Sequence, residues 1–140
     1  MGTEVRQLFK SKDLRCTRQR ADVYAALAAT KCHPTADELH STLSARGCCM
    51  SLATVYNTLE ALCKGGMCRK LTPASGPARF DADTTDHVHI MVDDGRILDA
   101  PEEINERLAA GLPKELRDEL ERQLGLSIRE LRVSVRAAAR

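Results

Sequence analysis

The fold is decided by residues 35–66, which read TADELHSTLSARGCCMSLATVYNTLEALCKGG. Thr35 followed three residues later by Glu38 is the pattern of a capping box, in which each side chain satisfies a free backbone N–H at the start of a helix. We therefore expect one helix that ends near Gly47 and a second that runs from Ser51 to the glycine pair closing the stretch. Two helices around a short turn containing glycine predict a helix-turn-helix.

Apolar residues recur at helical spacing in both helices, so each has one face that can be buried. The same spacing predicts two earlier helices, one at 4–11 and one that Thr17 caps and that runs to about Ala29. The residues expected to be buried are Val23, Tyr24 and Leu27 in the second of these, Ala36, Leu39 and Leu43 in the next helix, and Leu52, Val55, Leu59 and Leu62 in the last.

A β-hairpin is expected directly after the last of these helices. Residues 67–71 can form a strand, the Pro- and Gly-containing stretch 72–77 is typical of a turn, and residues 78–82 can form the returning strand. A hairpin in this position predicts a winged helix. A generic helical bundle that carries a hairpin is the alternative.

The rest of the chain reads as a second, smaller domain. Its expected elements are strands at 87–92 and 96–98 around an Asp-Gly turn, helices at 102–110 and 114–124, and a strand at 131–136. We therefore expect an α+β fold: a winged helix-turn-helix DNA-binding domain at 1–82, a hinge at 83–86, and a small α/β dimerisation and metal-regulatory domain at 87–140. A unit of about 55 residues buries too little apolar surface to be comfortable alone, so a homodimer is expected.

The composition excludes several classes of protein. Of the 140 residues, 43% are hydrophobic and 29% are charged, which is typical of a folded chain and not of a disordered one. No apolar run approaches the ~20 residues of a membrane span, and the N-terminal MGTEVRQLFK has no signal-peptide core. We expect a cytoplasmic protein with no membrane partner, in which the six cysteines are thiols, metal ligands or redox groups before they are disulfides.

The charge is distributed unevenly between the two parts. Residues 1–82 carry 12 Lys and Arg against 7 Asp and Glu, a net charge of +5, whereas residues 83–140 carry 9 against 13, a net charge of −4. A basic first part favours contact with nucleic acid, and an acidic second part favours assembly or regulation. A chance imbalance on a solvated surface is the alternative.

His87 and His89 stand two residues apart in an expected strand, so both imidazoles should project from the same face. A His-x-His pair beside several carboxylates is a common arrangement of metal ligands. The alternative is a pair of surface or hydrogen-bonded histidines. His40 fits no such pattern, and we interpret it as structural or solvent-facing.

Four motifs in this order resemble the ferric uptake regulator superfamily over roughly residues 10–100. They are Thr17-Arg-Gln-Arg20, His33-Pro-Thr-Ala-Asp37, Met50-Ser-Leu-Ala-Thr-Val-Tyr-Asn-Thr-Leu59, and Arg79-Phe-Asp81 followed by Asp86-His-Val-His89. Within the superfamily the chain is most similar to the peroxide-responsive branch. Asn57 after Tyr56, and Asp rather than Glu at Asp81 and Asp99, carry that similarity.

The resemblance implies a homodimeric transcription regulator, most simply a repressor, and not an enzyme. It implies one divalent metal ion per protomer, Fe(II) or Mn(II) before Zn(II), which favours the form that binds operator double-stranded DNA. The implied ligands are His33, Asp81, His87, His89 and Asp99. If the signal is peroxide, the resemblance implies that His33 or His87 gains an oxygen atom.

The helix after Ser51 is the expected recognition helix. Its exposed side near the N-terminus should meet base edges and phosphates, because Asn can read adenine and Thr or Tyr can contact phosphate or a thymine methyl. The expected DNA-binding residues are Ser51, Ala53, Thr54, Tyr56 and Asn57 on this helix, Arg15, Arg18 and Arg20 before it, and Arg69, Lys70 or Arg79 on the wing.

One feature departs from the superfamily, many of whose members hold a structural zinc ion with two C-x-x-C pairs. Here no C-x-x-C occurs, and all six cysteines precede residue 69. We therefore expect no structural four-cysteine zinc, and a dimer held by apolar packing, aided by the charged helix at 114–124.

Two other functions compete with this interpretation. A thiol-based redox regulator would use the cysteines of the first domain, with Cys48-Cys49 as the most suggestive pair; we prefer to interpret all six as small buried residues, with Cys63 and Cys68 at core positions. A hydrolytic metalloenzyme would use His33, His87 and His89. No general base or nucleophile stands out for it, and it leaves the helix-turn-helix without a role.

Overall fold

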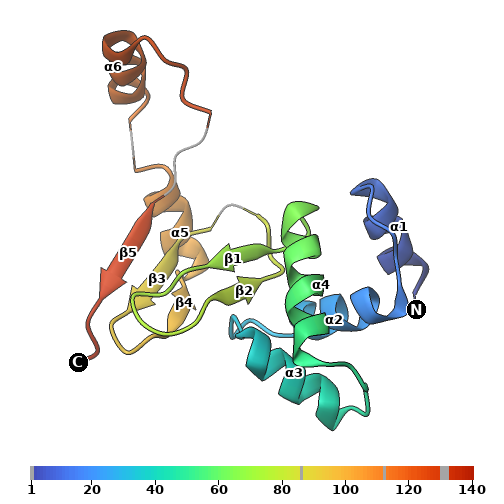
Figure 1. Ribbon diagram of the computed structural model, residues 1–140. Helices are drawn as coiled ribbons and strands as arrows, with labels where there is room; N and C mark the ends of the chain where they lie inside the picture. Colours follow the sequence, from blue (N-terminus) through green and yellow to red (C-terminus); the bar gives the residue numbers. More distant parts are fainter. Residues whose placement is uncertain (1, 86, 112, 130–132) are drawn as a thin grey trace. The chain divides into compact units, whose positions relative to one another are not determined.

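The computed structural model describes residues 2–85, 87–111, 113–129 and 133–140, and it divides into two compact units, Met1–Thr84 and Thr85–Arg140 (Figure 1). No helix among the described residues is long and apolar enough to cross a membrane. The architecture is α+β, with a mainly helical first unit and a second unit built around a small sheet.

The first unit is a winged helix. Its elements are α1 (Thr3–Ser11), α2 (Arg18–Ala28), α3 (Ala36–Ala45), α4 (Leu52–Lys64), β1 (Arg69–Leu71) and β2 (Arg79–Asp81). The helix-turn-helix predicted from the sequence is the α3–α4 pair, and the antiparallel hairpin β1–β2 follows α4 directly (Figure 1).

Side-chain caps fix where three of these helices begin. Thr17, Thr35 and Ser51 each accept a hydrogen bond from the backbone N–H three residues later, at 3.2, 3.2 and 3.1 Å. Glu38 Oε2 accepts from the Thr35 backbone N–H at 3.3 Å, which completes the predicted capping box. Each cap stabilises its helix by typically ~1 kcal/mol, so the sequence signals and the observed starts agree for a physical reason.

The core of the first unit joins all four helices. Its most buried members come from the faces that the helical spacing predicts, together with Phe9 of α1, whose ring packs edge-on against Tyr24. Leu52, expected in the core, is half-buried at the start of α4. The apolar side chains that are 1% exposed or less are Phe9, Val23, Leu27, Leu39, Leu43, Val55, Leu59 and Leu62.

The strand expected at 67–71 is shorter in the structure, because the first residues of that range belong to the turn that ends α4. Gly66 adopts a left-handed conformation with φ +71°, which ends the helix. The Met67 backbone N–H then donates to the Leu62 carbonyl at 2.9 Å. Met67 and Cys68 are buried as expected but lie before β1.

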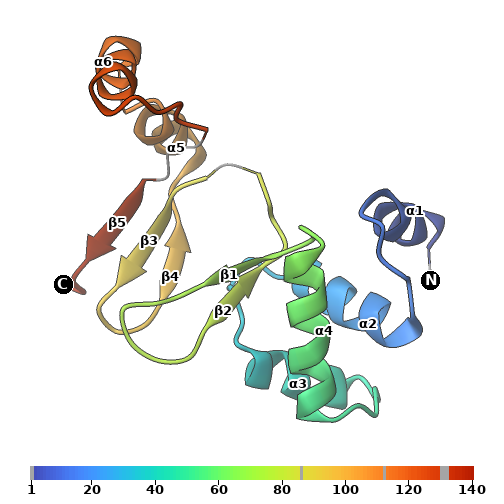
Figure 2. The same ribbon diagram turned by 45° about the horizontal axis from the view of Figure 1, so that its top comes forward.

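The second unit contains a three-stranded sheet with the order β4-β3-β5 (Figure 2). Its elements are β3 (His89–Val92), β4 (Ile97–Asp99), α5 (Glu102–Ala109), α6 (Lys114–Leu124) and β5 (Ser134–Ala137). β3 pairs with β4 antiparallel across the predicted Asp-Gly turn and with β5 in parallel. Helices α5 and α6 match the predicted ranges within one residue.

Two expectations about this unit need correction. His87 lies before β3 rather than within it, because Val88 bonds to a side chain and to a loop instead of a ladder. The last strand begins at Ser134, later than expected, and residues 131 and 132 lie outside the described part of the chain. The burial of residues 134–137 does alternate at a period of two, as the sequence pattern predicts.

Candidate metal centre and nucleic-acid interface

His33 lies on the loop between α2 and α3 in an uncommon backbone conformation. Its φ is +49°, in the left-handed region that residues other than glycine rarely adopt, and its side chain is 1% exposed. Such a conformation costs about 1–3 kcal/mol and persists only where surrounding contacts enforce it. A buried imidazole held in a strained loop is a candidate for function rather than for packing.

The contacts that hold His33 come from β2. Arg79 Nη1 donates to the His33 carbonyl at 3.1 Å, and the Phe80 backbone N–H donates to the Pro34 carbonyl at 3.0 Å. The same Arg79 nitrogen lies 3.6 Å from Glu38 Oε2. Arg79 is therefore a half-buried side chain that ties the loop and α3 to the wing, and its expected contact with DNA phosphate stays a prediction.

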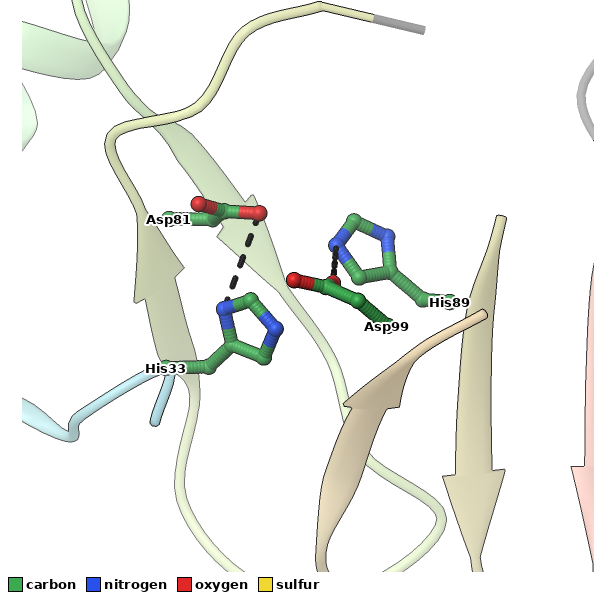
Figure 3. Close-up of side chains that lie close together, drawn as sticks. All are labelled: His33, Asp81, His89 and Asp99. Atoms are coloured by element: carbon green, nitrogen blue, oxygen red, sulfur yellow. Dashed lines mark ion pairs between the residues drawn. The ribbon is translucent and has the colours of Figure 1, made fainter. Parts of the chain in front are cut away.

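Asp81 supplies the partner of His33 in the first unit. His33 Nδ1 lies 3.6 Å from Asp81 Oδ2 (Figure 3), and Asp81 Oδ1 accepts a hydrogen bond from the Asp83 backbone N–H at 2.9 Å. The Asp81 residue is 6% exposed. A carboxylate this buried requires a cation or donors around it, so one oxygen is oriented by the backbone and the other faces the imidazole.

Two imidazoles and one carboxylate meet in the second unit. His87 Nε2 and His89 Nε2 each lie 3.4 Å from Asp99 Oδ1, and Figure 3 shows the His89–Asp99 contact. The ring centroids of His87 and His89 are 4.3 Å apart. His89 and Asp99 are register partners across the β3–β4 ladder, which places their side chains on one face of the sheet.

The segment around His87 is oriented by bonds to groups that the sequence did not single out. His87 Nδ1 lies 2.7 Å from the Thr85 carbonyl oxygen, which can only accept, so Nδ1 is the nitrogen that donates to it and Nε2 is the nitrogen that faces Asp99. The Val88 backbone N–H donates to Asn105 Oδ1 at 2.6 Å, and the Val88 side chain is buried. Buried Val88 thereby holds its two histidine neighbours in place.

Each unit thus presents a histidine–aspartate set with metal-ligand chemistry. Metal–imidazole bonds are about 2.0–2.1 Å long, so two donors on one ion are separated by roughly 3–4 Å. The pairs in both units have that separation. Imidazole and carboxylate donors suit Fe(II), Mn(II) and Zn(II) and do not select among them. The residues present fit a divalent metal ion.

The expected DNA-reading residues lie on the outer side of α4. Ser51, Ala53, Tyr56 and Asn57 are exposed, and Thr54 is half-buried. The Tyr56 hydroxyl donates to Asp37 Oδ2 on α3 at 3.3 Å, and the Asp37 charge raises the pKa of the Tyr56 phenol above its usual value. The hydroxyl therefore stays protonated and is pre-oriented by the preceding helix.

The basic residues near α2 and on the wing differ in how exposed and how bonded their side chains are. The Arg18 side chain is 90% exposed and makes a 4.0 Å contact with Asp22. Arg20 Nη1 donates to the Arg15 carbonyl at 3.0 Å, so it also shapes the loop before α2. On the wing, Arg69 Nη2 donates to the Thr84 carbonyl at 2.7 Å.

The interpretation of the six cysteines as small buried residues is wrong for most of them. Only Cys68 is buried, whereas Cys32 and Cys49 are exposed; Cys16, Cys48 and Cys63 are half-buried. The sulfur atoms in contact belong to Cys63 and Cys68. The sequence offered one signal for the Cys63–Cys68 contact: the two cysteines lie on either side of the glycine pair that ends α4. His40 is structural, as interpreted: its Nε2 lies 3.0 Å from the Met50 carbonyl.

Comparisons with known proteins define the class. The model of the ferric uptake regulator family matches residues 11–122. The peroxide operon regulator of Bacillus subtilis (strain 168) is 35% identical over 97 residues, which cover 69% of this chain. The chain therefore belongs to the ferric uptake regulator family, whose members are transcription regulators and not enzymes. It spans between 61% and 67% of the length of the curated relatives it matches.

Solved structures support the fold along the whole chain. A peroxide stress regulator from Campylobacter jejuni is 26% identical, with a TM-score of 0.69, and the match covers 100% of this chain and 98% of that one. A ferric uptake regulator from Pseudomonas aeruginosa, solved with manganese, is 22% identical, with a TM-score of 0.72 and 96% of both chains covered.

Proposed function

We propose that the protein is a homodimeric, metal-dependent repressor that binds operator DNA and releases it in response to peroxide. The observation that carries the proposal is that each unit holds its own histidine–aspartate set. His33 with Asp81 forms the buried set of the first unit, and His87 and His89 with Asp99 form the set of the second. Similarity to peroxide-responsive relatives supports the same function.

The two sets would bind one ion per protomer together. His33, Asp81, His89 and Asp99 each offer a ligand atom, and His87 adds a further imidazole. When donors from two units share one ion, binding favours the arrangement in which both sets reach it. That arrangement would fix the spacing of the two α4 helices of the dimer on successive major grooves.

Fe(II) or Mn(II) is the metal we propose, with Zn(II) as a weaker candidate. The donor set is compatible with all three ions. Solved ferric uptake regulators contain manganese and iron. We further propose that Cys-based structural zinc plays no part, because the sequence contains no C-x-x-C pair.

The peroxide response would consume a ligand. Fe(II) held by these residues would promote the two-electron reduction of a hydroperoxide by a neighbouring imidazole, in which one peroxide oxygen passes to the ring and the other leaves as water or an alcohol; Mn(II) does not readily promote this chemistry. His33 and His87 are the imidazoles we expect to gain an oxygen atom. An oxidised imidazole is a poorer donor, so the two units lose their shared ligand set and the operator is released.

The experiment compares the protein loaded with Fe(II) and with Mn(II), each exposed to hydrogen peroxide. Peptide mass spectrometry locates added oxygen, and operator binding is measured on the same samples. We expect an added oxygen atom on His33 or His87, with loss of operator binding, in the Fe(II) sample alone. Operator release that follows cysteine oxidation equally with both metals, with the histidines intact, would overturn the proposal.

The dimer would form through the second unit. Helix α6 has no buried residue, and its leucines follow one another at intervals of four along a single face. An apolar face of this size is expected to be covered by a partner, and a second copy of the unit is the partner we propose. The exposed large hydrophobic side chains of the unit are Leu98, Ile104, Leu116, Leu120, Leu124 and Leu126.

A further inference from the structure

Two thiols face each other across the turn that joins α4 to β1. Cys63 Sγ and Cys68 Sγ are 3.1 Å apart, with Cys63 in the last turn of α4 and Cys68 just before β1. The turn between them is held by the backbone: the Gly66 N–H donates to the Cys63 carbonyl at 3.1 Å, and the Met67 N–H donates to the Leu62 carbonyl at 2.9 Å. The fold therefore fixes the separation of the two backbone positions that carry these thiols.

The environments of the two sulfurs differ in a way that assigns them different roles. Cys68 is 3% exposed and its sulfur lies 3.9 Å from the Leu59 carbonyl, so it is part of the core. Cys63 is half-buried at the surface of the same cluster. A reagent that reaches this pair from solvent meets Cys63 first.

The hydrogen bond between the thiols polarises the pair. The bond from Cys68 lowers the pKa of the Cys63 thiol, and the Lys70 ammonium acts in the same direction against the effect of burial. The same bond, together with burial, raises the pKa of the Cys68 thiol far above its usual value. Cys63 is thus the more acidic thiol of the pair and the more readily converted to thiolate, which is the reactive form of cysteine.

We propose that Cys63 and Cys68 form a redox-active thiol pair that a hydroperoxide converts to an intramolecular disulfide. In the first step Cys63 loses its proton to solvent, its thiolate attacks a peroxide oxygen and the O–O bond breaks; Cys63 becomes a sulfenic acid, and the hydroxide or alkoxide that leaves takes up a proton from solvent to give water or an alcohol. In the second step the Cys68 sulfur attacks the Cys63 sulfur, the S–O bond breaks, and the Cys68 proton leaves with the oxygen as water. The two thiols lose two electrons, and the peroxide gains them.

Little movement is needed for the second step. A disulfide bond is about 2.05 Å long, so the sulfurs must approach by roughly 1 Å from their present 3.1 Å separation. The new bond would tie the end of α4 to the start of β1 within the first unit. No metal ion takes part, so this reaction is independent of the proposed oxidation of histidine.

The test uses the full chain loaded with Mn(II), treated with hydrogen peroxide, alkylated and digested with trypsin without reductant. Cleavage after Lys64 separates the two cysteines into peptides 47–64 and 65–69. We expect these peptides to be joined, with a loss of two hydrogen atoms, and to separate again after a dithiol reductant. Fragmentation assigns the bond to Cys63, because Cys48 and Cys49 lie in the same peptide.

Three variants make the result specific. Cys63→Ala should abolish the joined peptides and leave Cys68 free to be alkylated after denaturation, whereas Cys49→Ala, at an exposed site, should leave the joined peptides unchanged. Cys63→Ser gives the same expectation with a more conservative change, should the alanine variant fold poorly. Alkylated Cys68 in peroxide-treated wild-type protein, or joined peptides that persist in both Cys63 variants, would overturn the proposal.

Discussion

His33 combines three properties that rarely occur together in one residue: a left-handed backbone, a 1% exposed side chain and a buried carboxylate neighbour in Asp81. The strain is maintained by Arg79 and by the β2 backbone, which hold the loop in place. A residue needed only for packing would not require such support. We therefore propose His33 as the metal ligand of the first unit whose position the fold enforces most strongly.

The proposed DNA surface can be tested residue by residue on α4. Tyr56→Ala or Asn57→Ala should lower specific operator affinity by about 1–3 kcal/mol with little change in fold, because both side chains are exposed. Fluorescence anisotropy with operator and with scrambled DNA measures the effect. Glu60→Ala, an exposed position one turn further along α4, is the control. Unchanged operator affinity in both variants would refute the assigned surface.

Arg18 tests the sequence-independent part of the same surface. Because its side chain is 90% exposed, Arg18→Ala should weaken specific and non-specific binding alike and reduce the salt slope by about one. Binding isotherms at several salt concentrations give the slope. A selective loss of operator binding with an unchanged slope would assign Arg18 to base reading instead of to phosphate.

At the scale of elements, helices were predictable and strand ends were not. Three helix starts are fixed by local side-chain hydrogen bonds, which depend only on nearby sequence; the capping residues are Thr17, Thr35 and Ser51. The start of β3 depends on a bond between distant residues, in which the Val88 backbone N–H donates to Asn105 Oδ1, and no local pattern contains it. The start of β1 depends on the closing of the α4–β1 turn, in which the Met67 N–H bonds back to Leu62. The Cys63–Cys68 contact was not predicted, because it depends on the geometry with which the α4–β1 turn closes.

Thr17, the capping residue of α2, offers a test of whether local hydrogen bonds stabilise the helix starts. Thr17→Ala removes the acceptor for the Arg20 backbone N–H and should lower the free energy of unfolding of the first unit by about 1 kcal/mol. Chemical denaturation followed by far-UV circular dichroism measures it. Thr3→Ala, at the exposed first residue of α1, should change stability by less than half as much. Equal effects of the two substitutions would contradict the assigned cap.

At the scale of the whole molecule, motifs in the sequence could indicate the proposed metal donors but could not show how these side chains are held. His33 and Asp81 lie 48 residues apart in the sequence. They come together because Arg79 of β2 donates a hydrogen bond to the His33 carbonyl in the loop before α3. The expectation that His87 and His89 share a strand was wrong, yet both reach Asp99. Family motifs identified these residues, and tertiary contacts supply their orientation.

The proposed dimer should depend on apolar packing and not on metal. Leu120→Glu places a charge in the middle of the exposed apolar face of α6 and should shift the protein to monomers in analytical ultracentrifugation. Chelation of wild-type protein should release at most about one metal ion per protomer and leave the dimer intact. Arg122→Gln, which makes the same change of one unit of charge at an exposed position on the opposite side of α6, is the charge control. Monomers after chelation alone would contradict this account.

The central claim is that His33 joins the metal set that controls DNA binding, and a Mn(II) titration of operator binding tests it most directly. His33→Asn removes the imidazole while tolerating the left-handed backbone, and His40→Asn is the matched control. Wild-type protein and His40→Asn should reach full operator binding near one Mn(II) per protomer, whereas His33→Asn should require at least about tenfold more metal. An unchanged Mn(II) response in His33→Asn would contradict the account.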